Sequence, residues 1–183
     1  MRGIKGAQFI PPPKRRGYSC EIWIKSAKEA DIPVIEEILL DALNWLESIG
    51  SKMWVKSRIT WEFLSQWIAI DEFCLAYMDQ RPVGCMALTD HDPTIWEDIQ
   101  KGESLFVHRL AVRREAAGQG VSKALLDYAK AQAVRRGINA VRLDCWRDRE
   151  KIRAIYEREG FVCVKETFLF DHYHAALYVW QGK

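Results

Sequence analysis

The stretch LFVHRLAVRREAAGQGVSKALLDYAKAQAVRRGINAVRLDCW, residues 105–146, decides the fold expected for this chain. Its pattern predicts an apolar strand over 104–112, a turn with two glycines, an amphipathic helix beginning near Gly118, and a second apolar strand over 140–146. The first strand is apolar almost throughout, which indicates a central strand with both faces covered. Backbone N–H groups and the positive end of the helix dipole converge at 118–122, which predicts a binding site for a phosphate or pyrophosphate.

Length and composition limit the classes of protein. A chain of 183 residues, 49% hydrophobic and 28% charged, is expected to be globular. The net charge of +2 does not indicate a nucleic-acid partner. No apolar run reaches the roughly 18 to 20 residues of a membrane span, and the N-terminus lacks the apolar core and cleavage site of a secretory signal. We therefore expect a cytoplasmic protein without a membrane partner.

The five cysteines, at positions 20, 74, 85, 145 and 163, show neither CxxC nor Cys/His spacing. Most of them lie inside apolar runs. Buried free thiols in a reducing compartment are therefore expected, and no metal site.

The remaining elements surround this stretch. Residues 1–17 combine three consecutive prolines with a Lys-Arg-Arg cluster and are predicted to form a mobile or polyproline-like tail, which leaves 18–183 as one domain. Further predictions are a strand over 18–25, a helix ending at Gly50, a helix over 61–70, a hairpin of 73–78 and 83–89, a helix over 147–159, and a closing hairpin of 161–170 and 173–180. This order implies an α/β fold with a mixed, mostly antiparallel sheet of six to seven strands and about four helices.

Tryptophans crowd the first third of the chain, at positions 45, 54, 61 and 67. Aromatic residues at helical spacing are typical of core packing, and the alternative is the wall of a substrate pocket.

Two motifs then point to a family. LAVRREAAGQGVSKALL, residues 110–126, resembles the acyl-CoA-binding motif of the GNAT N-acetyltransferase superfamily, Gln/Arg-x-x-Gly-x-Gly/Ala after a strand. AVRLDCWRDREKIRAIYEREGF, residues 140–161, resembles the superfamily's next motif, which closes on Tyr-x-x-x-Gly-Phe. HRLAV and RLDCW further resemble a group of bacterial GNAT proteins. The resemblance covers residues 20–181.

The resemblance implies an acetyl-CoA-dependent N-acetyltransferase. The acceptor would be a primary amine that attacks directly, on a small molecule more readily than on a protein. The alternative is a non-catalytic acyl-CoA-binding module. Whether the protein forms a homodimer is left open by the sequence. Nucleotide hydrolysis is disfavoured because Gly120-Val-Ser-Lys123 lacks the Gly-Lys-Ser/Thr order, and dinucleotide binding because GxG is not extended to GxGxxG.

The resemblance also implies where coenzyme A binds: the central strand would hold the pantetheine arm and the glycine turn the phosphates. The expected contacts are Leu110, Ala111, Val112, Arg113, Arg114, Ala117, Gly118, Gln119, Gly120, Val121, Ser122, Lys123, Arg149 and Tyr156. Two positions depart from the motifs. Glu115 stands where Gln or Arg is usual, so only its backbone N–H is expected to contact coenzyme A. Arg149 stands where Asn is frequent.

Tyr156 matches the superfamily's tyrosine and is the expected general acid for the leaving thiolate, with simple core packing as the alternative. An amine arrives mostly protonated, so a base is needed. Glu103, His108 and Asp90 are candidates near the central strand, and the sequence does not choose among them. His108 shares a strand face with Leu110 if no bulge intervenes.

Overall fold

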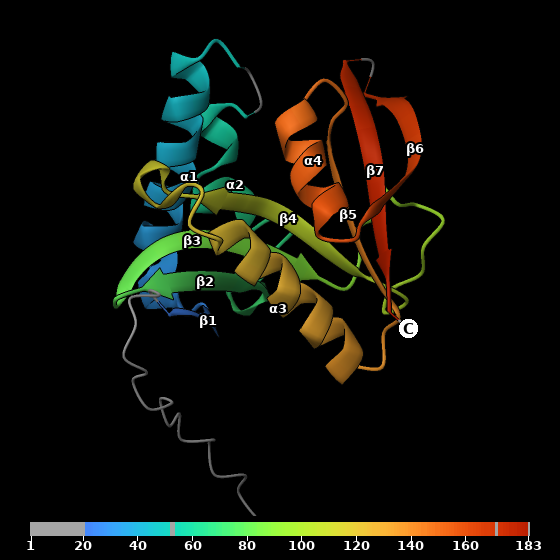
Figure 1. Cartoon of the computed structure of the whole chain (residues 1–183), viewed down its shortest axis with the longest axis horizontal. Coiled ribbons are helices and arrows are strands. Elements are labelled where there is room, and N and C mark those ends of the chain that lie inside the picture. Colours follow the sequence, from blue (N-terminus) through green and yellow to red (C-terminus); the bar gives the residue numbers. More distant parts are fainter. Residues whose placement is uncertain (1–20, 52–53, 171, 183) are drawn as a thin grey trace, which may run out of the picture.

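The computed structural model describes residues 21–51, 54–170 and 172–182, so the predicted tail over 1–17 lies outside the described residues. A seven-stranded sheet in the order β1-β2-β3-β4-β5-β7-β6 forms the centre (Figure 1). The strands are β1 Ile22–Ser26, β2 Phe73–Met78, β3 Arg81–Thr89, β4 Leu105–Val112, β5 Ala140–Trp146, β6 Val162–Leu169 and β7 Tyr173–Gln181. Only the β4–β5 pair is parallel. The predicted mixed, mostly antiparallel sheet and the central place of β4 are confirmed.

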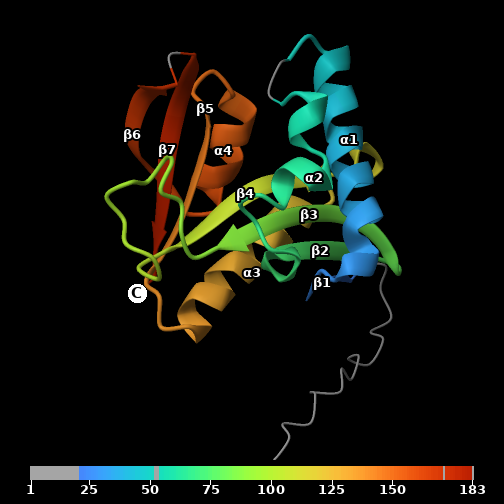
Figure 2. The same ribbon diagram turned by 180° about the vertical axis from the view of Figure 1, so that it is seen from behind.

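Helices cover both faces of this sheet. They are α1 Ile32–Ser48, α2 Trp61–Leu64, α3 Val121–Arg135 and α4 Glu150–Arg158. One core cluster joins α3 and Tyr156 of α4 to one sheet face, and a second joins α1 and α2 to the other. The view from behind shows α1 and α2 in front of β2 and β3, with α3 beyond them (Figure 2).

The apolar stripe predicted for the first helix explains α1. Its buried residues recur at three- and four-residue steps and are Ile35, Ile38, Leu39, Leu43 and Leu46. Pro33 stands in the first turn, and Gly50 follows the end with a φ of 69°. The helix begins at Ile32, directly after a 3₁₀ turn over Glu29–Asp31 that follows β1.

Two predicted elements differ from the structure. The helix over 61–70 ends at Leu64, because residues 70–72 form a 3₁₀ turn in which Glu72 Oε2 accepts a hydrogen bond from the Ala69 N–H at 2.8 Å. The connection in the first hairpin is two residues rather than four. Asp79 and Gln80 both adopt positive φ, 46° and 66°, as in a type I′ turn, and β3 starts at Arg81.

Three of the cysteines, Cys74, Cys85 and Cys145, are buried and free, and Cys163 is free and partly buried. These four agree with the expectation of free thiols, while Cys20 lies outside the described residues. None of the helices in the described part of the chain has the length and apolarity needed to cross a bilayer.

The two central strands separate along their length. β4 and β5 pair only at Leu105 with Val141 and at Phe106 with Arg142, although β4 continues to Val112 and β5 to Trp146. The backbone edges beyond Phe106 therefore diverge. This divergence opens the sheet in the middle of the molecule.

Candidate active site

A cleft of about 1680 Å³ lies where β4 and β5 diverge. Its walls come from β4, the start of α3, the end of β5, α4, the segment from α1 to α2, and the loop after β3. Ligand pockets usually measure roughly 300 to 1,000 Å³, so this cleft has room for a large ligand and a second, smaller one.

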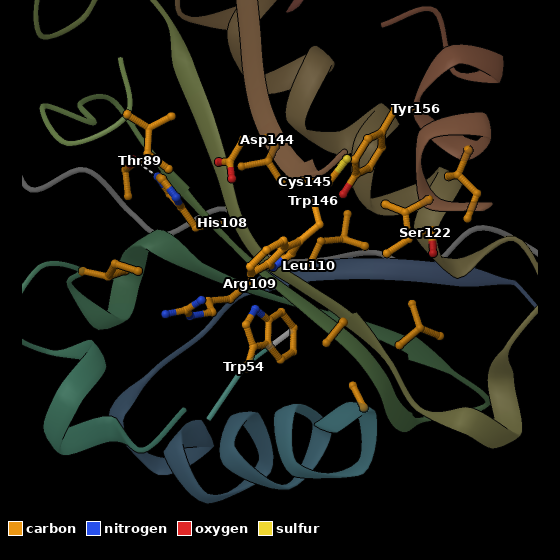
Figure 3. A pocket seen from close by; sticks show the side chains of 18 of the residues that line it. Trp54, Thr89, His108, Arg109, Leu110, Ser122, Asp144, Cys145, Trp146 and Tyr156 are labelled. Carbon is orange, nitrogen blue, oxygen red and sulfur yellow. Dashed lines mark hydrogen bonds between the residues drawn. The ribbon is translucent and has the colours of Figure 1, made fainter. Parts of the chain in front are cut away.

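A bulge in β4 divides the cleft into two sides. Ala87 pairs with His108 and Cys85 with Ala111, so two residues of β4, Arg109 and Leu110, oppose one residue of β3. Arg109 absorbs the extra residue with a φ of 53°. His108 and Leu110 are expected to share a face only in an unbulged strand, and the bulge removes that condition. Leu110 packs with the α3 cluster, whereas the His108 ring faces the opposite end of the cleft (Figure 3).

Backbone donors gather where α3 begins. Gly118 and Gly120 adopt positive φ, 78° and 84°, and α3 starts at Val121. The first helical hydrogen bond runs from the Ala124 N–H to the Gly120 carbonyl at 2.9 Å. The N–H groups of 121–123 thus stand outside the helical ladder, at the positive end of the helix dipole. This arrangement suits a phosphate group.

Gly84 of β3 fixes the position of this helix start, and sequence reasoning missed it. A Cβ atom at Gly84 would meet Val121 Cγ1 at 2.8 Å and the Ala111 carbonyl oxygen at 3.1 Å. Any side chain at this position would therefore push α3 away from β4. An isolated glycine inside an apolar strand is the signal that could have found it.

The predicted cationic contacts fall into two groups. Arg114 and Lys123 line the cleft, but Lys123 forms ion pairs with Asp127 and with Glu159. The Arg113 guanidinium turns away, pairing with Glu37 at 2.9 Å and donating to the Pro82 carbonyl at 3.0 Å. Side-chain cations therefore add less to this end of the cleft than the sequence suggests.

Most of the expected coenzyme A contacts meet in the cleft. Those that line it are Leu110, Ala111, Val112, Arg114, Ala117, Gly118, Gly120, Val121, Ser122, Lys123 and Tyr156. Arg113, Gln119 and Arg149 are described in the structure and do not line it. Arg149 stands just before α4, where its Nε lies 3.6 Å from an Asp148 carboxylate oxygen.

Tyr156 serves both the core and the cleft. Its ring contacts Phe161 and Tyr178, with centroid separations of 6.2 Å and 5.7 Å. Its hydroxyl points into the cleft beside the Cys145 sulfur (Figure 3). Burial raises the pKa of the Tyr156 hydroxyl above its ordinary value, and Cys145 and Asp144 raise it further. The group therefore keeps its proton at neutral pH.

The three candidate bases are placed very differently. Glu103 is exposed, accepts a hydrogen bond from the Gln100 N–H at 3.2 Å, and does not line the cleft. Asp90 lines the cleft and pairs at 3.7 Å with Lys101 at the surface. His108 lines the cleft and is partly buried.

The Thr89 hydroxyl links His108 to the loop after β3. Thr89 Oγ1 lies 3.1 Å from the His91 carbonyl oxygen, to which it can donate, and 3.1 Å from His108 Nε2. When the hydroxyl proton is given to the His91 carbonyl, Nε2 is the donor to Thr89, and in this tautomer Nδ1 of the neutral ring keeps its lone pair. Burial lowers the pKa of His108, while the charge of Asp92 opposes this. The ring is therefore neutral at pH 7 and able to accept a proton.

Sequence reasoning missed three further residues at this end. Asp144 of β5, Asp92 of the loop after β3, and Arg109 all line the cleft. Burial raises the pKa of Asp144 to about 6, helped by Asp92 and opposed by Arg109 and by a hydrogen bond from Tyr173. An acid inside an apolar strand was the signal for Asp144. No local signal marks Arg109, because the bulge depends on the register with β3.

The tryptophans divide between the two roles considered for them. Trp61 packs edge-on against Phe73, with centroids 6.2 Å apart, and belongs to the core. Trp45, Trp54 and Trp67 line the cleft, and Trp54 also packs against the α1 core.

A comparison with known families identifies this arrangement. The family model described as acetyltransferase (GNAT) family matches residues 39–161. The chain belongs to the acetyltransferase (GNAT) family. It is an acyltransferase of the N-acetyltransferase class.

Related proteins agree with this assignment. The uncharacterized N-acetyltransferase YesJ of Bacillus subtilis (strain 168) is 28% identical to this GNAT protein over 150 residues, which are 79% of this chain and 81% of YesJ. A GNAT-family acetyltransferase from Listeria monocytogenes 4b F2365 superposes with a TM-score of 0.72 at 24% identity, covering 92% of this chain and 99% of the other. The PaiA N-acetyltransferase of Thermoplasma acidophilum, solved in complex with coenzyme A, gives 0.70 at 17% identity, covering 88% and 99%. These two structures establish the shared fold.

The departures from the family motifs leave the backbone site intact. The exposed Glu115 lies in the 3₁₀ turn 114–116, and its carbonyl accepts a hydrogen bond from Gln119 Nε2 at 2.9 Å. Neither the Glu115 nor the Arg149 side chain lines the cleft of this acetyltransferase. Both substitutions therefore stand beside the site rather than in it.

Proposed function

We propose that this acetyltransferase moves an acetyl group from acetyl-CoA to the primary amine of a small molecule by direct attack. One observation carries the proposal. The same cleft contains the backbone donors at the start of α3, the unpaired edge of β4, and the Tyr156 hydroxyl. An anion-binding turn, a strand edge for an extended chain, and a proton donor are what an acyl-CoA thioester requires.

The residues of the cleft fit coenzyme A along its length. The N–H groups of 121–123, together with the two positive-φ glycines, would hold the pyrophosphate. The backbone of residues 110–112 would bind the pantetheine arm as an added strand, since β5 has already diverged there. A β4 N–H next to the bulge would polarise the thioester carbonyl.

Acetyl-CoA supplies the acetyl group as a thioester, and the chain supplies the proton transfers. The attack forms a C–N bond and breaks a C–S bond. The acceptor ammonium first loses one proton to the solvent, because only the neutral amine can attack. The leaving sulfur then takes a proton from Tyr156, and the second proton lost by the nitrogen goes to His108 Nδ1. Proton exchange with the solvent restores both groups. Among the three bases expected from the sequence, we assign His108, because its ring is neutral, points into the cleft and has a free lone pair.

A covalent route through the enzyme is disfavoured. Cys145 is the thiol beside the Tyr156 hydroxyl in the cleft. Burial raises the pKa of the Cys145 thiol to about 12, and the charge of Asp144 contributes. A protonated thiol is a poor nucleophile, so transfer through Cys145 is not expected.

Two measurements on Tyr156→Phe test the proposal. Release of free thiol from acetyl-CoA, followed with a panel of primary amines, should show turnover in the wild type. In Tyr156→Phe it should fall by about 100- to 1,000-fold, because the thiolate leaves without its proton. The rise in melting temperature caused by acetyl-CoA should stay almost unchanged. A ligand at 100 times its dissociation constant adds about 2.7 kcal/mol to the free energy of unfolding.

The alternatives give different results. Equal loss of turnover and binding in Tyr156→Phe would mean that the tyrosine only supports the core. A melting shift with acetyl-CoA and no thiol release with any amine would identify a non-catalytic acyl-CoA-binding module. Absence of both would reject the proposal.

A further inference from the structure

The end of the cleft beyond the β4 bulge carries a paired arrangement of charges that the coenzyme A contacts do not use. We call it the acceptor end and define it by Arg58, Arg109, Asp92, Asp144 and Trp54, all of which line the cleft. Figure 3 shows Arg109 above Trp54 on one wall, and Asp144 on the other wall with His108.

The positive wall is Arg109, which forms no contact ion pair with the carboxylates of the described residues. The Arg109 guanidinium lies 5.7 Å from the centroid of the Trp54 ring, a cation–π contact that fixes its direction. In the described ranges, no carboxylate stands within 4.0 Å of it. Burial lowers the pKa of Arg109, Asp144 raises it and Arg58 lowers it, so the guanidinium is desolvated and a second cation lies nearby. A buried cation of this kind is stabilised by an anion.

The backbone at Arg109 supports a specific role for its side chain. Arg109 is one of four non-glycine residues with positive φ among the described residues, and it lies in the middle of the central strand. Such a conformation is strained and persists where the surrounding structure enforces it, as at binding sites. The bulge aims the guanidinium into the cleft instead of into the core.

The negative wall contains a carboxylate oxygen without a partner. Asp92 is 7% exposed. Its Oδ1 accepts hydrogen bonds from the N–H groups of Thr94 at 3.2 Å and Ile95 at 3.1 Å, whereas its Oδ2 has no hydrogen-bond partner among the described residues. Asp92 is close enough to Asp144 for its charge to raise the pKa of Asp144. Two acids at one wall attract a cation or share a proton.

We infer that the acceptor is a small amine that also carries a carboxylate, as an amino acid does. The fork of Arg109 binds the carboxylate, with Arg58 adding to the positive field. Asp144 and Asp92 attract the ammonium group and bring it to His108, next to the thioester position. The rest of the acceptor faces Trp54 and Trp67, which favours an apolar side chain. This inference rests on the proposed function.

Matched pairs of acceptors test the inference. Each of a set of α-amino acids with apolar side chains is compared with the amine that lacks its carboxylate, for example phenylalanine with phenethylamine, by thiol release at saturating acetyl-CoA. We expect kcat/KM to be at least about 100-fold higher for the amino acid, the discrimination that a bidentate charge-assisted contact gives. Equal or better rates with the decarboxylated amines would overturn the inference and leave the proposed function intact.

Arg109 variants identify the group responsible. Arg109→Gln should raise the KM of the amino acid about 100-fold and change the KM of acetyl-CoA and the rate with the decarboxylated amine far less, so that the ratio of kcat/KM between the two acceptors falls toward one. Arg109→Lys should restore part of it, since it keeps the charge but loses the fork. If Arg109→Gln lowers the rates of both acceptors equally, the arginine is structural and the inference fails.

A binding measurement covers the remaining case. If acetyl-CoA raises the melting temperature but no amine releases thiol, the same pairs are tested as ligands of the coenzyme A complex. The amino acids must then raise the melting temperature further in the wild type and not in Arg109→Gln, while the decarboxylated amines must not. No shift with any amino acid counts against the inference, and no shift with acetyl-CoA counts against the proposed function itself.

Discussion

The cofactor end and the acceptor end of the cleft are built from different kinds of atoms. At the cofactor end the chemistry lies in backbone groups of two contiguous segments, the edge of β4 and the start of α3. At the acceptor end it lies in side chains from distant segments, including Arg58, Asp92, Arg109 and Asp144. A backbone site depends on chain geometry and is insensitive to most side-chain changes. A side-chain site changes its ligand with one substitution.

The strongest test of this contrast places a charge among the backbone donors. Ser122→Glu should weaken acetyl-CoA binding by about 100-fold or more, because the carboxylate would lie against the pyrophosphate. An acid in the first turn of α3 is favourable to the helix, so the fold should be retained. Isothermal titration with acetyl-CoA measures the loss.

Ser122→Gln is the matched control, similar in size and neutral. It should bind acetyl-CoA within about 3-fold of the wild type, since a surface hydroxyl adds little to the backbone donors. Wild-type affinity in both variants would show that the anion is not held at the start of α3.

A smaller effect is expected for the buried acid of the acceptor end. The pKa of Asp144, about 6, lies above its ordinary value, so the folded protein holds this proton more tightly than the unfolded chain does. The stability of the wild type should therefore fall as the pH rises from about 4 to 6, and the penalty is complete above pH 6. Asp144→Asn removes the charge and should raise the free energy of unfolding by about 3 kcal/mol at pH 8. Urea unfolding at both pH values measures this difference.

The pH dependence distinguishes the removal of a buried charge from a gain in stability that is the same at every pH. At pH 4 the wild type and Asp144→Asn should have nearly equal stability, because Asp144 is then protonated. Asp90→Asn, at a side chain that is 38% exposed in the same cleft, is the control for replacing an exposed acid. A pH-independent difference for Asp144→Asn would argue against a desolvated charge at this position.

The smallest effect is expected where a side-chain cation stands at the cofactor end. Lys123→Gln should change the KM of acetyl-CoA by less than about 3-fold, because Lys123 is exposed and already pairs with Asp127 and Glu159. Initial rates at varied acetyl-CoA check this. A large increase in KM would mean that the cofactor end also depends on side-chain charge, and the contrast between the two ends would be lost.

The same contrast explains what the sequence could predict. The strand 140–146 and the helix after Gly118 were predicted closely, because periodicity and glycine positions are local signals. Those signals also located the backbone donors of the cofactor end. They could not reveal that Arg113 turns toward Glu37, because that pair joins residues far apart in the chain.

The acceptor end was beyond local reasoning for a related reason. The face of His108 depended on whether a bulge interrupts β4, and the bulge is a matter of register between two strands. Arg109 became a candidate only when that register was known. Glu103 shows the opposite case, an acid that lies close in sequence to β4 but whose side chain is exposed outside the cleft.

Gly84 has a consequence for the size of the bound molecule. The absence of a side chain there lets Val121 rest against β3, with the Ala111 carbonyl close by. Gly84 thereby influences the distance between the edge of β4 and the start of α3, the two segments that we propose bind the pantetheine arm and the phosphates. Gly84 is thus the fixed point against which the start of α3 is positioned. A methyl group at Gly84 would push Val121 away from β3 and lengthen this distance. The distance would then no longer match the length of a pantetheine arm.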